Sequence, residues 1–306
     1  MPESFAVFVL RRAVAVVVVS VVVSALTFVT IHGLSPQSFP GARSLPVELA
    51  DYLRRAFLHA DLGSSWGRSQ RPVLSLIGAA LPADLSLVVG AVVVGAVSGV
   101  AAGTACATRP GTALSAVLQF AGTVLLCAPV YVVGMLLILA FAPSVGAPVP
   151  IGLVAPNTYV GLTHDPLSWL RALVVPWFVA GAPLAGMCLR MTRATLPEAL
   201  DADFVRTASA KGLSPRRIAA LHSLPVALAP TISLVGSYVP LLVGNVVLVE
   251  AVFGIPGVYR LIPNALDQGD FPLLQGIVIV GAVFVVISNA IVDIALAALD
   301  PRIRRS

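Results

Sequence analysis

Six stretches of this sequence lack charged residues over lengths that suit a membrane-spanning helix, and no other feature limits the fold as strongly. With His counted as neutral, they cover residues 13–42, 85–108, 110–164, 172–189, 218–249 and 271–292. About 20 apolar residues in a row span the hydrocarbon core of a bilayer. Only 11% of the residues are charged and 58% are hydrophobic, so a soluble domain would lack a charged surface. The pattern therefore predicts an all-α integral membrane protein.

The third stretch is too long for one helix, and its second half is rich in Pro and Gly. Residues 143–161 therefore indicate a loop or a re-entrant surface. Arg11 and Arg12 precede a Val-rich run about twice as long as the apolar region of a signal peptide, so we expect the first span to be retained. Residues 1–306 are then one transmembrane domain with six predicted spans: 10–31, 85–107, 114–142, 172–191, 226–250 and 275–298.

The distribution of basic residues predicts the orientation of these spans. Twelve of the 19 Lys and Arg residues fall on the side of the two termini, and seven fall on the other side. Because cytoplasmic loops carry an excess of Lys and Arg, we expect both termini in the cytoplasm. The net charge of +5 then reflects the excess of basic residues on the cytoplasmic side, and no nucleic-acid partner is expected. Most residues outside the membrane belong to an outer segment, 32–84, and a cytoplasmic loop, 192–225.

The rarer residue types argue against enzyme chemistry in this chain. Its one lysine, Lys211, lies in Ala-Lys-Gly, whereas a P-loop requires Gly-Lys followed by Ser or Thr. If ATP drives the protein, another polypeptide must therefore bind the ATP. Cys106, Cys127 and Cys188 lie in apolar runs without a CxxC pair, so we expect packing residues and neither a disulfide nor a metal site. No cofactor is expected on the chain itself.

The cytoplasmic loop carries the clearest local signals. Residues 197–210 are good helix formers after a proline that suits a first turn. Gly212 is expected to be left-handed, a conformation in which a side chain would cost about 1 kcal/mol or more. Ser214 and Pro215 then suit the N-cap and first position of a second helix. Such a helix–glycine–helix elbow suits insertion into a groove of a partner, although on residues alone a solvated helical loop is equally consistent.

The elbow resembles the cytoplasmic loop of ABC importer permeases. Five residues match the spacing of that loop: Thr207, Ala208, Gly212, Leu224 and Pro225. The longer stretch 203–214 resembles the dipeptide/oligopeptide permease family, with Phe204 and Ser209 where the family usually has tyrosine and arginine.

Further patches resemble the same family, in its order along the chain. They are Arg11-Arg12, residues 61–65 with 71–73, residues 249–257, 270–272 and 275–276, and a closing segment with Asn289, Asp293 and residues 300–304. The short lead into the first span and the final Asp-Pro-Arg resemble the B-type subunit. Departures lie on the outer face, where residues 34–38 replace a usual Pro-Gly-Asp-Pro and Tyr259 replaces a glycine.

The resemblance implies a type I ABC importer permease in the bacterial cell membrane, forming half of a pore for di- or oligopeptides. The implied partners are membrane lipid, a second homologous permease in a heterodimer, two ATP-binding subunits or one fused ATPase that hold ATP and Mg, and a peptide-binding lipoprotein. The elbow would be the coupling helix, with Arg206 and Lys211 either pairing with ATPase acids or simply solvated. The implied coupling residues are Arg206, Thr207, Ala208, Ser209, Lys211, Gly212, Leu213, Ser214, Leu224 and Pro225.

Four polar residues within or beside the spans are candidates for the pore or for contacts between subunits: Asn245, Glu250, Asn289 and Asp293. Charged groups at membrane depth are costly and are often functional. By contrast, Gly95, Gly99 and Gly103 repeat every four residues and indicate close helix packing. Nickel or a nickel chelate is the alternative cargo. A secondary transporter is disfavoured, because matching broken helices in two halves are missing from the pattern.

Overall fold

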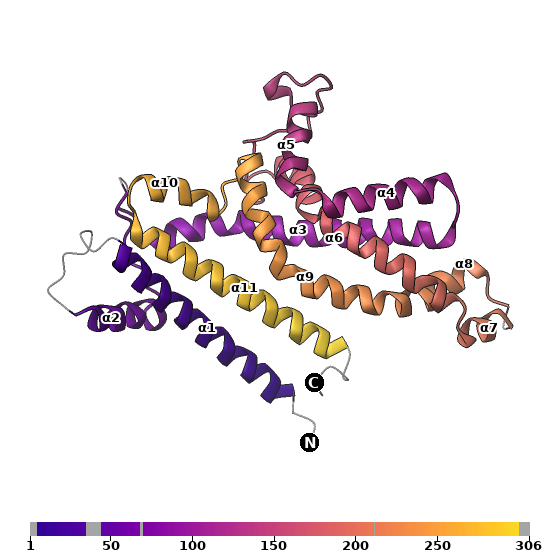
Figure 1. The fold of residues 1–306 in the computed structure, drawn as a ribbon, viewed down its shortest axis with the longest axis horizontal. Helices are drawn as coiled ribbons and strands as arrows, with labels where there is room; N and C mark the ends of the chain where they lie inside the picture. Colours follow the sequence, from indigo (N-terminus) through magenta and orange to yellow (C-terminus); the bar gives the residue numbers. More distant parts are fainter. Residues whose placement is uncertain (1–4, 35–43, 68–69, 211, 300–306) are drawn as a thin grey trace. The chain divides into compact units, whose positions relative to one another are not determined.

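The computed structural model describes residues 5–34, 44–67, 70–210 and 212–299, and Figure 1 shows the helices that they form. Within these ranges β pairing is limited to an isolated bridge between Ser64 and Pro72. The all-α prediction is therefore confirmed. The chain divides into two compact units: unit 1 comprises Met1–Asp84 and Pro256–Ser306, and unit 2 comprises Leu85–Ile255.

Unit 1 is built around two long apolar helices that lie side by side, α1 (Phe5–Leu34) and α11 (Phe271–Leu299) (Figure 1). A shorter helix, α2 (Leu45–Leu58), packs on α1 through Tyr52, whose ring stacks on Phe28 with centroids 5.0 Å apart. The first turns of α3 (Val73–Thr108) and the short α10 (Ile262–Asp267) complete the unit. Their buried core includes Val73, Ile77, Leu273 and Ile277.

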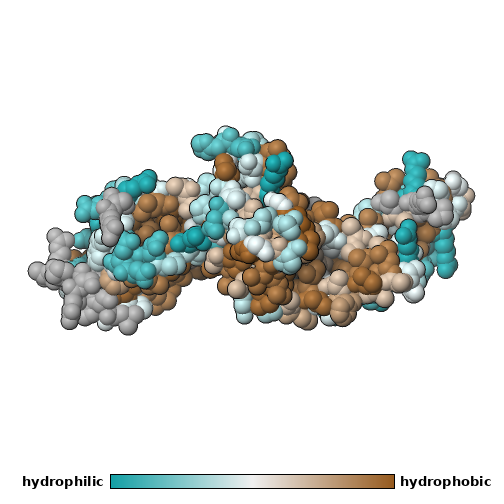
Figure 2. All heavy atoms as spheres, turned by 90° about the horizontal axis from the view of Figure 1, so that it is seen from above, coloured by the Kyte–Doolittle hydropathy of each residue, from teal (hydrophilic) through white to brown (hydrophobic). Residues whose placement is uncertain are grey.

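Unit 2 contains the rest of α3 together with α4 (Ala113–Cys127), α5 (Val130–Phe141), α6 (Pro166–Leu200) and α9 (Leu224–Phe253). The central element is α6, which packs against both α4 and α9. Asp165 caps its first turn, since its Oδ1 accepts from the backbone N–H groups of Leu167 at 3.0 Å and Ser168 at 3.2 Å. Two short helices, α7 (Asp203–Ala210) and α8 (Pro215–Ile218), join α6 to α9. In Figure 2 hydrophilic residues gather at the end of unit 2 that carries α7 and α8.

Glycines in α3 allow it to approach the backbone of α6, as the four-residue repeat predicted. A Cβ atom added at Gly95 would lie 2.7 Å from the carbonyl oxygen of Gly181, and one at Gly103 would lie 2.7 Å from that of Leu189. Gly99 faces Ala185 in the same way. Cys106 and Cys188 are buried in these two helices, as expected for packing residues, whereas Cys127 at the end of α4 is exposed.

The candidate spans differ from the prediction in the third and second helices. Five helices are long and apolar enough to cross a bilayer, and the pair α4 and α5 adds a sixth if it is counted as one bent span. The span predicted over 114–142 is not one straight helix, because the pair bends by 113° at Ala128 and Pro129. The cause is local: a residue before proline avoids the helical region, and Ala128 has a ψ of 133°.

The second apolar helix, α3, begins at Val73, ahead of the residue 85 predicted from charge. Asp84 lies inside it and is buried. Its carboxylate oxygens accept from the backbone N–H of Val258, at 3.1 Å and 3.3 Å. A carboxylate with such a partner does not need to reach water, so the charge does not end the helix.

Candidate functional site

The elbow between α7 and α8 has the backbone geometry that the sequence predicted. Gly212 is left-handed with a φ of +79°. Its N–H donates to the carbonyl of Ser209 at 2.9 Å, and the N–H of Leu213 donates to the carbonyl of Ala208 at 3.3 Å. These two bonds are the Schellman pattern that ends a helix and reverses the chain direction. The turn therefore needs a residue that adopts the left-handed conformation at position 212, which glycine does at no steric cost.

The helices on either side of the elbow begin and end at residues that partly differ from the prediction. The helix expected from Pro197 is wrong at its start, because α6 runs through Pro197 to Leu200 and α7 begins only at Asp203. Packing explains the longer α6: Leu196 and Ala199 are buried, and so continue the apolar face of the helix beyond the expected end. The start of the second helix at Pro215 is confirmed, and Ile218 N–H donates to the carbonyl of Ser214 at 3.0 Å.

The expected coupling residues form a small and largely exposed surface. Four of them are exposed: Arg206, Thr207, Ser209 and Ser214. Leu213 is half-buried, and Ala208 in α7 is buried. Arg206 lies 3.9 Å from Asp203, one turn away, with both side chains almost fully in solvent. Such an exposed pair adds little stability, so the guanidinium is available to a partner. Lys211 lies outside the described residues.

The far arm of the elbow is anchored to the ends of α6 and α9. A π-helical turn, Ala219–Ser223, leads from α8 into α9. Leu224 then packs on a cluster formed by Leu196, Ala199 and Ala227, while Pro225 next to it is exposed. The hydroxyl of Thr195 in α6 also donates to the carbonyl of Ala227 in α9, at 2.8 Å. A force on the elbow would therefore act on both α6 and α9.

The candidate polar residues are divided between the two units. Asn245 and Glu250 lie on α9, where Asn245 Nδ2 donates to the hydroxyl of Tyr238 at 3.2 Å and Glu250 is fully buried. Asn289 is exposed on α11. Asp293 also belongs to α11, but its side chain lies outside the described part. These residues thus form two separate pairs along the chain, and their joint role stays a prediction.

A segment after α5 covers the end of α9 beside Glu250. The backbone N–H of Asn157 donates to the carbonyl of Phe253 at 2.8 Å, and Asn157 itself is left-handed, with a φ of +61°. The last turn of α9 is closed by Gly254 and Ile255, whose N–H groups both donate to the carbonyl of Glu250. The Pro- and Gly-rich region predicted as loop is thus ordered against this helix end.

Asp270 organises the outer motifs, a role that sequence reasoning did not identify. Its buried carboxylate accepts from the hydroxyl of Ser65 and from the backbone N–H groups of Trp66 at 3.0 Å, Gly67 at 3.2 Å and Leu273 at 3.2 Å. It thereby ties the loop before α3 to the start of α11. The available signal was that residues 61–65 and 270–272 carry the same family resemblance, although nothing in the sequence places them together.

A metal centre is not apparent in the described part of the chain, where no three His, Cys, Asp or Glu side chains gather closely enough to hold an ion. The apolar helices, the anchored elbow and the outer Asp270 network are therefore the features that bear on function.

Known proteins similar to this chain are transport permeases. Residues 99–305 match the family model described as binding-protein-dependent transport system inner membrane component. The dipeptide transport system permease protein DppB of Haemophilus influenzae is 29% identical over 97% of this chain and 99% of its own length. The oligopeptide transport system permease protein AppB of Bacillus subtilis is 32% identical over 80% of this chain and 77% of its own length. The family match includes the elbow, α6, α9 and α11.

Proposed function

Because this chain belongs to the family of inner membrane components of binding-protein-dependent transport systems, we propose that it forms one half of the translocation pore of an ATP-driven importer for di- and oligopeptides. It is a multi-pass membrane protein, as its apolar helices require. The observation that carries the proposal is the match of almost the whole chain to a dipeptide permease, together with an exposed elbow within the residues that match the family.

The proposed partners follow from what this chain lacks and what its family requires. Its sequence contains no P-loop, so separate ATPase subunits, or one fused ATPase, would hold ATP and Mg. A second homologous permease would complete the pore. A peptide-binding lipoprotein outside the membrane would deliver the substrate. If both termini lie in the cytoplasm, as the basic residues predict, the elbow would lie on the side of the ATPases.

The proposed mechanism uses the elbow as a mechanical link. Its exposed face, with Arg206 and Thr207, would sit in a groove of the ATPase, and closure of the ATPases on ATP would displace it. The elbow leads into α9, which Leu224 and the Thr195 hydrogen bond tie to α6, so the displacement would tilt both helices. Packed helices move as rigid bodies, because the close-packed side chains between them resist deformation. The pore would then open toward the outside and accept peptide.

Co-purification tests this function directly. The tagged chain would be isolated from gently solubilised membranes, and the proteins present in stoichiometric amounts would be identified. We expect a second permease and P-loop ATPases, whose ATP hydrolysis rises when a peptide-loaded receptor is added. Stimulation by a nickel-loaded receptor and not by peptide would assign the alternative cargo. A chain that purifies alone and transports without ATP would refute the importer assignment and favour a secondary transporter.

A further inference from the structure

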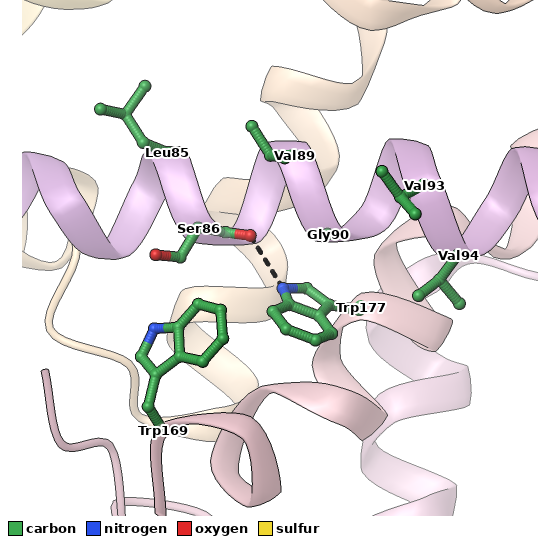
Figure 3. A pocket seen from close by; sticks show the side chains of 8 residues that line it. All are labelled: Leu85, Ser86, Val89, Gly90, Val93, Val94, Trp169 and Trp177. Carbon is green, nitrogen blue, oxygen red and sulfur yellow. Dashed lines mark hydrogen bonds between the residues drawn. The ribbon is translucent and has the colours of Figure 1, made fainter. Parts of the chain in front are cut away.

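Two recesses differ in the chemistry of their walls. The first, between α3 and α6 in unit 2, is lined almost entirely by apolar side chains, and the indole N–H of Trp177 there already donates to the carbonyl of Ser86 at 2.8 Å (Figure 3). The second, of about 470 Å³, lies on α2 in unit 1. Of the two, the recess on α2 is the one that offers charged groups to a ligand. Its lining residues are Asp51, Arg54, Arg55 and His59.

The recess on α2 carries an excess of positive charge that a ligand can reach. With His59 neutral, the two guanidinium groups of Arg54 and Arg55 outnumber the carboxylate of Asp51 by one. Both arginine residues are exposed. Guanidinium groups bind phosphate through paired, charge-assisted hydrogen bonds. The recess therefore suits the phosphate group of an anionic ligand.

An apolar line of residues runs along α2 beside the recess. Four apolar residues follow one another at helical spacing and so lie along one side of the helix: Pro46, Ala50, Leu53 and Phe57. Leu53 packs against the core of unit 1. The other three are exposed, Phe57 by 37%. Arg54 comes four residues after Ala50 and three before Phe57, which places it next to this exposed line. The helix thus presents apolar and basic groups side by side.

The contact between α2 and α1 gives the depth of α2 in the bilayer. Residues 13–34 of α1 contain no Asp, Glu, Lys or Arg, so the hydrocarbon core begins after Arg12. At about 1.5 Å per residue, Phe28 lies about 24 Å beyond Arg12, and the core is about 30 Å thick. The ring of Phe28 stacks on Tyr52 of α2, with centroids 5.0 Å apart. This face of α2 therefore lies about 6 Å inside the edge of the core, within the roughly 5–10 Å that is typical of interfacial amphipathic helices.

We propose that α2 lies in the bilayer interface and that its recess binds the phosphate of an anionic phospholipid through Arg54 and Arg55. At this depth lipid acyl chains cover the apolar line that includes Phe57. The two arginine side chains extend from the same level towards the headgroups, as long basic side chains do near membrane surfaces. A soluble protein partner fits less well, because it would have to reach apolar residues below the headgroups. The proposal is independent of the cargo of the transporter.

A photo-crosslinker at position 57 tests both parts of the proposal in the full chain with its co-purified subunits. Phe57 is replaced with p-benzoylphenylalanine, which keeps an aromatic ring at this partly exposed position. The complex is placed in nanodiscs with equal amounts of phosphatidylglycerol and phosphatidylcholine, and peptide-loaded receptor is added. After irradiation the adducts are identified by mass spectrometry. We expect lipid adducts, with the anionic phosphatidylglycerol favoured over phosphatidylcholine.

Substitutions in the crosslinker-bearing chain isolate the charge. Arg54→Gln and Arg55→Gln should each lower the preference for phosphatidylglycerol about fivefold, the factor that corresponds to about 1 kcal/mol per basic residue near an anionic membrane surface. Arg71→Gln removes another exposed arginine of unit 1, outside the recess, and should leave the preference unchanged. Adducts with the receptor or another polypeptide in place of lipid, equal labelling of the two lipids before any arginine is replaced, or an equal loss in Arg71→Gln would each overturn the proposal.

Discussion

Replacing Gly212 with valine tests the elbow, because the structure confines the perturbation to the backbone. A Cβ atom at this position would meet no heavy atom within 4 Å, so no neighbouring side chain would clash. What remains is the left-handed conformation, with a φ of +79°, which costs a residue with a side chain about 1–2 kcal/mol. A cost of this size lowers the ratio of native to non-native elbow by a factor of about 5–30.

We therefore expect Gly212→Val to accumulate in the membrane but to import less peptide per ATP hydrolysed, by at most about 5–30-fold. The assay is peptide uptake and ATP hydrolysis in proteoliposomes that contain the full complex. Gly111→Val is the matched control, since Gly111 has a φ of +75°, equally open surroundings and a place in a different turn, between α3 and α4. Gly212→Asn should retain most coupling, because asparagine tolerates the left-handed region. Normal uptake by Gly212→Val, or equal uncoupling by Gly111→Val, would refute the reasoning.

Three further predictions concern packing, the outer network and pH. Gly95→Val should destabilise unit 2 by about 1–3 kcal/mol or more, because its Cβ would approach the α6 backbone, as chemical unfolding in detergent would show. Asp270→Asn removes a buried charge that accepts backbone N–H groups and should cost about 1–3 kcal/mol, seen as faster proteolysis of the loop before α3. The hydrogen bond from the Ser168 side chain, aided by its backbone N–H, lowers the pKa of Asp165. The carboxylate cap at the start of α6 is therefore fully present above the ordinary aspartate pKa and is lost as pH falls through the lowered value, which a carboxyl-carbon NMR titration would follow.

Each of these predictions has a control or an outcome that contradicts it. Gly78→Val lies in the same helix with nothing within 4 Å of its added Cβ, so it should cost clearly less than Gly95→Val. Equal costs would show that helix propensity, and not close packing, sets the effect. Unchanged proteolysis of Asp270→Asn would mean that its carboxylate is not what holds the outer loop. For Asp165, a pKa that stays low in Ser168→Ala would assign the shift to a different cause.

Features that depend on a single residue's backbone preference were predictable. The left-handed Gly212, the helix start at Pro215 and the approach of α3 to α6 at Gly95 all agree with the structure. Each follows from a local steric property: glycine lacks a Cβ, and proline fixes its own φ. The bend before Pro129 has the same kind of cause.

Contacts between residues distant in sequence determined the features of the fold that were not predicted. The sequence by itself determined that the chain is helical and apolar and carries an elbow, since these properties reside in composition, periodicity and single residues. Only the tertiary structure let α3 continue through Asp84, carried α6 past Pro197 and joined the outer loop to Asp270. In each case a contact with residues distant in sequence outweighs what the charged residue or the proline indicates locally. A buried carboxylate that accepts distant backbone N–H groups no longer marks the end of a helix or a surface.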